Sequence, residues 1–140
     1  MNQRTTDKCA QAVASRLTPG ENVETIEVAQ IGKVSAKQKA AVAAAVGIVT
    51  AGTVIVSVKP RAYYLVFTSQ RLFLVENNRG LVGKVVAQCA RESITAGPLK
   101  GHLLTLTADV TLDGTAYQFN WGRLAPGQAR SAMATLTGQP

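Results

Sequence analysis

RAYYLVFTSQRLFLVE, residues 61–76, is the most informative stretch of this sequence. It predicts two β-strands, about 62–68 and 71–76, because aromatic and β-branched residues dominate both arms and a short polar turn separates them. An antiparallel hairpin with one face in water alternates apolar and polar residues, and this one does not. We therefore expect both of its faces to be covered. The cover for the outer face is expected to be the Ala-rich segment before it, or another subunit.

The segment before the hairpin, residues 40–58, carries no charged residue. Its first half is rich in Ala and its second half in β-branched residues, which predicts a helix about 36–47 and then a strand about 53–59. Two alternatives stay open: a membrane-spanning helix, whose length the segment meets, and an element that lies on a membrane surface or in an oligomer. The absence of Leu and Phe disfavours the spanning helix.

Upstream and downstream of these segments, the pattern predicts more strands between two amphipathic helices. The N-terminal helix, about 5–17, has an apolar stripe of Cys9, Val13 and Leu17. A helix from Pro126 to a stop at Gly138 closes the chain. The expected strands are 22–31 with a bulge, 83–90, a short one around Ile94, 102–112 and 115–121.

The last two strands form the clearest hairpin of the sequence, because Asp113-Gly114 is a strong turn signal. A two-residue turn places Val110 opposite Tyr117, Ala108 opposite Phe119 and Leu106 opposite Trp121. Directly opposed residues share a face, so the apolar sets of both strands coincide. We expect the three aromatic residues in the core, with Leu104 on the same apolar face.

Composition limits the classes of function. The chain has 140 residues, which predicts one domain, and a hydrophobic content of 46% that excludes a disordered chain. Its net charge of +7 and pI near 9.9 favour anionic partners. No two basic residues are adjacent, and exposed aromatic residues are not interleaved with them, which disfavours nucleic acid.

Residues that carry chemistry are few. His102 is the only histidine, and no carboxylate or nucleophile accompanies it at a recognisable spacing. Cys9 and Cys89 are isolated, which argues against a zinc site, and we expect both as reduced, partly buried thiols. We therefore expect no enzyme, no cofactor, no metal and no small-molecule substrate, and a cytoplasmic location with membrane association as an alternative.

Four local patterns occur in a characteristic order. Pro19-Gly20-Glu21 follows a short helix, Phe67–Leu72 reads FTSQRL, Gly83–Gln88 reads GKVVAQ, and Asp113-Gly114 precedes Tyr117 and Phe119. In this order the chain resembles the bacterial pleckstrin-homology-like (PH-like) domains, relatives of the PH and GRAM superfamily, over about 17–137. The resemblance implies an α+β, mostly β fold: a bent antiparallel sandwich or partly open barrel of about seven strands. A C-terminal helix would cap it, and an Ala-rich insertion, about 33–52, would separate the first two strands.

The resemblance also implies a function. Eukaryotic members that bind inositol phospholipids carry basic residues between their first two strands, where this chain has a similar but interrupted set. The apolar hairpin and the Ala-rich segment themselves favour a non-catalytic interaction module that binds a protein partner or self-associates through the insertion and the 61–76 hairpin. The alternative is a peripheral module for anionic lipid that uses residues 33–61. The expected interaction residues are Lys33, Lys37, Lys39, Val42, Val46, Lys59 and Arg61.

Arg71 ends the turn of the 61–76 hairpin. A guanidinium at this position can bond carbonyl groups or a carboxylate such as Glu76, and so hold the neighbouring loop. We expect Arg71 to be a structural anchor rather than a ligand contact.

Overall fold

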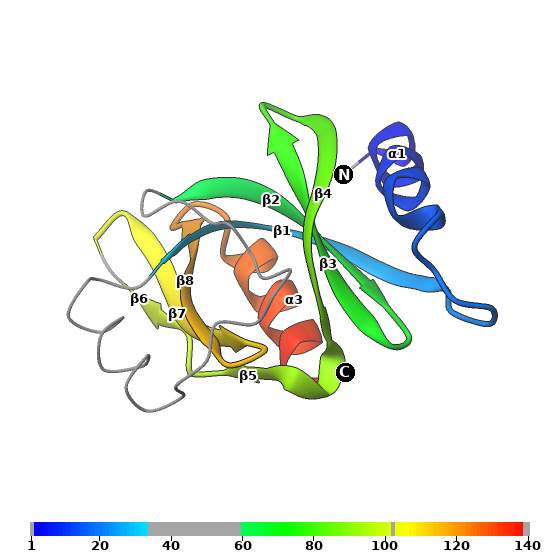
Figure 1. Ribbon diagram of the computed structural model, residues 1–140. Helices are drawn as coiled ribbons and strands as arrows, with labels where there is room; N and C mark the ends of the chain where they lie inside the picture. Colours follow the sequence, from blue (N-terminus) through cyan, green and yellow to red (C-terminus); the bar gives the residue numbers. More distant parts are fainter. Residues whose placement is uncertain (1, 34–59, 102, 139–140) are drawn as a thin grey trace.

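The computed structural model describes residues 2–33, 60–101 and 103–138, and within them it is an antiparallel sheet with two α-helices (Figure 1). This confirms a mostly β, α+β fold. The predicted helix 36–47 and strand 53–59 lie outside the described residues. The elements are α1 (Gln3–Ala14), β1 (Val23–Lys33), β2 (Arg61–Thr68), β3 (Arg71–Asn78), β4 (Leu81–Ala90), the 3-10 turn η1 (Arg91–Ser93), β5 (Ile94–Ala96), β6 (Lys100–Gly101), β7 (Thr105–Leu112), β8 (Thr115–Gly122) and α3 (Pro126–Leu136).

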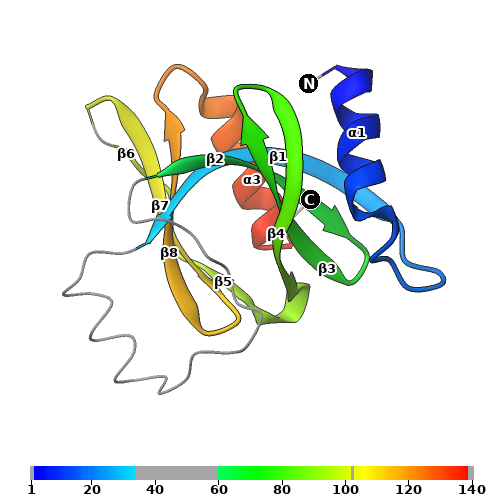
Figure 2. The same cartoon turned by 45° about the horizontal axis from the view of Figure 1, so that its top comes forward.

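The sheet has the order β4-β3-β2-β1-β8-β7-β5, and β6 pairs with β7. Strand β1 joins its two halves, because it pairs with β2 along most of its length and with β8 through residues 30–33. The register of β1 shifts between Val23 and Thr25, which confirms the predicted bulge. Figure 2 shows how strongly the sheet curves around α3.

The β7–β8 hairpin has the predicted register. Val110 lies opposite Tyr117, Ala108 opposite Phe119 and Leu106 opposite Trp121. Asp113 and Gly114 both have positive φ angles, 51° and 84°, as a tight two-residue hairpin turn requires.

The start of this hairpin was predicted wrongly. Strand β7 begins at Thr105, opposite Gly122 at the end of β8, so Leu104 has no strand partner. Its side chain is 77% exposed and does not belong to the core. The apolar alternation of the sequence continues beyond the last residue of the partner strand. For this reason the predicted strand, 102–112, began too early.

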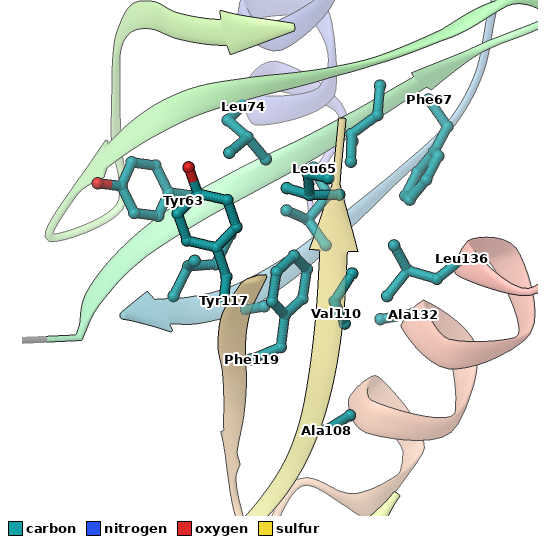
Figure 3. Close-up of a cluster of buried hydrophobic side chains, with 14 of the residues drawn as sticks. Tyr63, Leu65, Phe67, Leu74, Ala108, Val110, Tyr117, Phe119, Ala132 and Leu136 are labelled. Atoms are coloured by element: carbon teal, nitrogen blue, oxygen red, sulfur yellow. The ribbon is translucent and has the colours of Figure 1, made fainter. Parts of the chain in front are cut away.

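The inner core lies between the curved sheet and α3. Figure 3 shows side chains of β2, β7, β8 and α3 pointing toward one another. Its larger members are Ile31, Tyr63, Leu65, Phe67, Leu72, Leu74, Val110, Leu112, Tyr117, Phe119, Trp121 and Leu136. The Trp121 indole Nε1–H donates to the carbonyl oxygen of Val28 at 2.7 Å, so its polar group is satisfied. The predicted aromatic core is confirmed.

The outer face of the β2–β3 hairpin is covered by α1, an element that the sequence did not indicate as its cover. The Ala-rich segment, which was expected there, lies outside the described residues. Cys9 and Val13 of α1 are fully buried and pack against a second cluster on β2 and β3. That cluster consists of Tyr64, Val66, Phe73 and Val75. The helix begins at Asn2, whose side chain accepts the Thr5 N–H at 2.8 Å. The predicted apolar stripe is confirmed, and its residues cover the outer face of the hairpin.

Candidate anion-binding site

A cavity of about 590 Å³ opens where β2 begins and β3 ends. Tyr63 and Glu76 lie opposite each other in the register of these strands, which brings the two ends together. The lining residues are Arg61, Ala62, Tyr63, Glu76, Asn77, Asn78 and Arg79. Polar and basic groups therefore predominate in it.

The tight β3–β4 turn positions Arg79. Arg79 and Gly80 have φ angles of 54° and 89°, so they form the two central residues of a hairpin turn. The Asn77 side chain fixes this turn, because its Oδ1 accepts the Gly80 N–H at 2.8 Å. Arg79 is exposed at the rim, and Arg61 is exposed at the first position of β2.

The electrostatics of the cavity favour an anion. The lining residues include two arginines, Arg61 and Arg79, and one carboxylate residue, Glu76, whose Oε1 accepts the Lys84 N–H at 3.0 Å. Tyr63 lines the cavity but is only 4% exposed and belongs to the inner core, and this burial raises its pKa. Guanidinium, amide and hydroxyl donors together are the groups that bind phosphate and carboxylate oxygens.

Of the predicted interaction residues, Arg61 lies at this cavity. Lys33 ends β1, opposite Tyr117 in the register and two positions beyond Ile31, which pairs with Arg61. Lys37, Lys39, Val42, Val46 and Lys59 lie outside the described residues. Sequence reasoning missed Arg79. The sequence NNRG, residues 77–80, indicated a turn. It did not indicate that Arg79 in this turn lines the same cavity as Arg61 at the start of β2.

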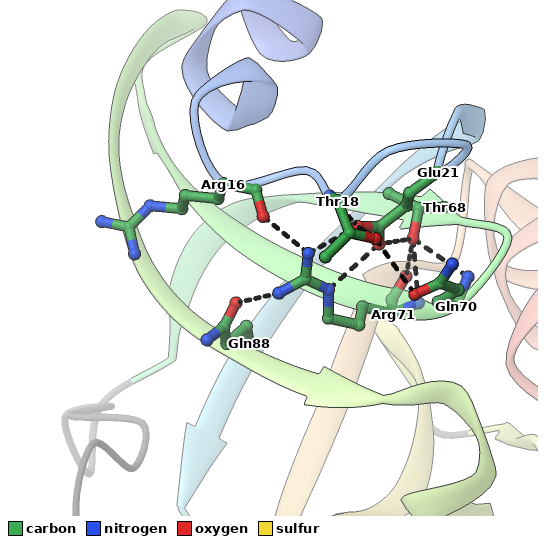
Figure 4. Close-up of polar contacts among 7 residues, drawn as sticks. All are labelled: Arg16, Thr18, Glu21, Thr68, Gln70, Arg71 and Gln88. Atoms are coloured by element: carbon green, nitrogen blue, oxygen red, sulfur yellow. Dashed lines mark hydrogen bonds and ion pairs between the residues drawn. The ribbon is translucent and has the colours of Figure 1, made fainter.

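Arg71 lies in a second polar group, at the other end of the β2–β3 hairpin (Figure 4). Its Nη2 and Nε contact the two carboxylate oxygens of Glu21 at 2.5 and 3.0 Å. Nη2 also donates to the Arg16 carbonyl at 2.6 Å, and Nη1 donates to Gln88 at 3.0 Å. Arg71 was expected to bond carbonyl groups or a carboxylate such as Glu76. It contacts the Arg16 carbonyl, and the carboxylate is that of Glu21 rather than Glu76.

Glu21 is the centre of this group. Its side chain has no exposed surface, and its Oε2 accepts the Thr68 hydroxyl at 2.5 Å while Oε1 accepts the Thr18 N–H at 3.0 Å. The hydrogen bond from Arg71 lowers the pKa of Glu21 to about 2. This group ties the loop between α1 and β1 to the β2–β3 turn.

The remaining candidates for chemistry are weak. Burial raises the pKa of Cys9 to about 11 and that of Cys89 to about 12, so both stay as unreactive thiols. The described residues hold no group of three or more His, Cys, Asp or Glu that could share a metal ion. No helix within the described ranges combines the length and the apolarity needed to cross a membrane.

Fold and site together define an α+β domain whose antiparallel sheet carries a basic cavity at one end. No protein-family model matches this sequence, and no curated protein matches it significantly.

Proposed function

We propose that this chain is a non-catalytic, PH-like module that binds the anionic surface of a membrane through the cavity at Arg61 and Arg79. The observation that carries the proposal is the meeting of two exposed guanidinium groups with Tyr63, Asn77 and Asn78 around one opening. A phosphate-bearing lipid headgroup satisfies these donors. The chain's net charge of +7 adds attraction toward an anionic surface.

The strand order supports the PH-like part of the proposal. The resemblance implies a bent antiparallel sheet with a C-terminal helix against it. In accord with this, β1 pairs with both β2 and β8, and Ala129, Ala132 and Leu136 of α3 pack into the inner core.

Self-association through the β2–β3 hairpin has less support than lipid binding. That hypothesis depended on an uncovered apolar face, and Cys9 and Val13 of α1 cover this face. Its other element, the Ala-rich segment, lies outside the described residues.

The experiment is co-sedimentation with phosphatidylcholine vesicles that contain phosphatidylserine. The variant R61Q/R79N removes both charges, and Asn at position 79 tolerates the positive φ angle of the turn. Each basic side chain near an anionic surface contributes about 1 kcal/mol. We therefore expect this variant, which loses two such contributions, to bind about thirtyfold more weakly.

The matched control is K8Q/R16Q. Both side chains are exposed on or just after α1, so this variant loses the same charge without touching the cavity. If both variants weaken binding equally, total charge rather than the cavity is responsible, and the proposed site is wrong.

A further inference from the structure

Four large hydrophobic side chains are strongly exposed among the described residues, and three of them lie on two neighbouring turns. Leu103 and Leu104, in the β6–β7 turn, are 87% and 77% exposed, and Leu124, in the β8–α3 turn, is 102% exposed. The backbone N–H of Arg123 donates to the Leu104 carbonyl at 3.1 Å, which joins the turns. We call Leu103, Leu104 and Leu124 the leucine tip.

The leucine tip projects from the sheet and is firmly supported. Figure 2 shows both turns near each other at the upper edge of the molecule. Just behind the tip, Gly101 pairs with Leu106, whose side chain packs against the inner core. On the other turn, the Ala125 N–H donates to the Gly122 carbonyl at 2.9 Å. Strand pairing and backbone hydrogen bonds thus connect the exposed leucines to the sheet.

Basic residues stand next to the leucine tip. A Cβ atom built on Gly101 would lie 3.9 Å from Nη1 of Arg123, so this guanidinium lies against the β6–β7 turn. Lys100 precedes the turn, and its Nζ is 4.0 Å from Asp109, with both side chains 58% exposed. So exposed an ion pair is weak, and it leaves Lys100 able to interact with other anions.

We propose that the leucine tip inserts into the apolar layer of an anionic membrane, with Lys100 and Arg123 at the level of the headgroups. Exposed apolar side chains beside basic ones suit the boundary between acyl chains and anionic headgroups. The tip projects, so a protein partner would need a matching hollow, whereas a fluid bilayer adapts to it. The inference rests on the proposed function, since both place the chain on an anionic membrane.

In Figure 2 the β3–β4 turn and both leucine-bearing turns point toward the top of the view. The β3–β4 turn carries Arg79 and contributes to the cavity. The insertion and the headgroup contact can therefore occur on the same side of the chain.

The test places an environment-sensitive fluorophore (NBD) on the full chain carrying L124C. Cys9 and Cys89 are buried, so the introduced cysteine is labelled selectively. The control is S69C in the β2–β3 turn, which is exposed and lies far from the tip in both views. With phosphatidylcholine–phosphatidylserine vesicles, we expect a blue shift and a gain in intensity at position 124 and none at position 69.

The second measurement uses L103S/L104S/L124S, which keeps every charge and changes only exposed side chains. We expect its vesicle binding to fall about tenfold or more, because three leucines no longer leave water. Unchanged binding together with a silent label at position 124 overturns the insertion. A blue shift that needs high protein concentration and no vesicles shows a second copy on the tip, and it also overturns the proposal.

The two proposals fail separately. If R61Q/R79N binds like the parent while the label at position 124 shifts, the cavity proposal falls and the insertion stands. If R61Q/R79N binds weakly while the label stays silent, the insertion falls and the cavity proposal stands.

Discussion

Glu21 and Arg71 are fifty residues apart in sequence and form the most buried ion pair of the described structure. Replacing Glu21 by Gln leaves the Arg71 guanidinium, which is largely buried, without its counter-charge. We expect E21Q to lower the free energy of unfolding by about 2 to 3 kcal/mol, between the values typical of exposed and fully buried pairs. Urea denaturation at neutral pH measures this change.

The matched control for E21Q is E24Q. Glu24 also contacts an arginine, Arg91, at 2.6 Å, but its side chain is 51% exposed. An exposed pair contributes at most about 1 kcal/mol. Equal losses of stability in the two variants would contradict the structural role given to Glu21.

The same carboxylate predicts how stability depends on pH. The pKa of Glu21 is about 2 in the folded chain, below its ordinary value of 4.5. The ionised Glu21 carboxylate contributes its full stabilisation of the fold above pH 4.5. This contribution is lost as the pH falls from 4.5 toward 2 and the carboxylate becomes protonated. Denaturation curves across this range should therefore show parent and E21Q converging as the pH falls. A difference that stays constant down to pH 2 would contradict the assignment.

Sequence reasoning at the residue scale found Arg71 but not its partner. Arg71 ends the predicted hairpin turn, so its side chain was expected to hold the neighbouring loop. Glu76 was a carboxylate close to it in sequence that could serve as its partner. Glu21 reaches Arg71 only because the loop after α1 folds back over the β2–β3 turn. That loop conformation depends on where α1 docks, which no local pattern specifies.

Among the elements, α1 is the one whose packing role the sequence did not reveal. The stripe of Cys9, Val13 and Leu17 predicted an amphipathic helix correctly, but periodicity reports only that a face is apolar. It does not report which surface receives that face. The β2–β3 hairpin predicted that its outer face is covered, and the expected cover was the Ala-rich segment or another subunit. The apolar face of α1 lies against it instead.

The cover can be tested by weakening α1. Val13 is fully buried against β2 and β3, and V13S replaces its apolar contacts by a hydroxyl. We expect a loss of about 2 to 3 kcal/mol in unfolding free energy and increased binding of the dye ANS, as the outer cluster becomes accessible. Q11S, at an exposed position of the same helix, should change neither. Equal behaviour of the two variants would mean that α1 does not cover the hairpin.

The β7–β8 hairpin was predicted pair by pair because two independent signals agreed there. Asp113-Gly114 set the turn, and strict alternation set the faces, so only one register satisfied both. Leu104 shows the limit of alternation, since nothing in the pattern marks where the partner strand ends. The candidate site was harder to predict from the sequence. Arg61 and Arg79 are eighteen positions apart, and only the pairing of β2 with β3 brings them to the same cavity.

At the scale of the whole molecule, we propose a basic domain that lies on an anionic membrane, with the cavity at the headgroups and the leucine tip in the apolar layer below them. Under this proposal, the net charge of +7 supplies long-range attraction and the few groups at the cavity supply specificity. Attraction of this kind weakens as salt shortens the range of charge interactions.

Flotation of the full chain with vesicles at low and high salt tests this account most directly. We predict strong binding to phosphatidylcholine vesicles that contain phosphatidylserine, weak binding to phosphatidylcholine alone, and a marked decrease at high salt. Binding that phosphatidylserine does not increase, or no binding to either vesicle, would contradict the account.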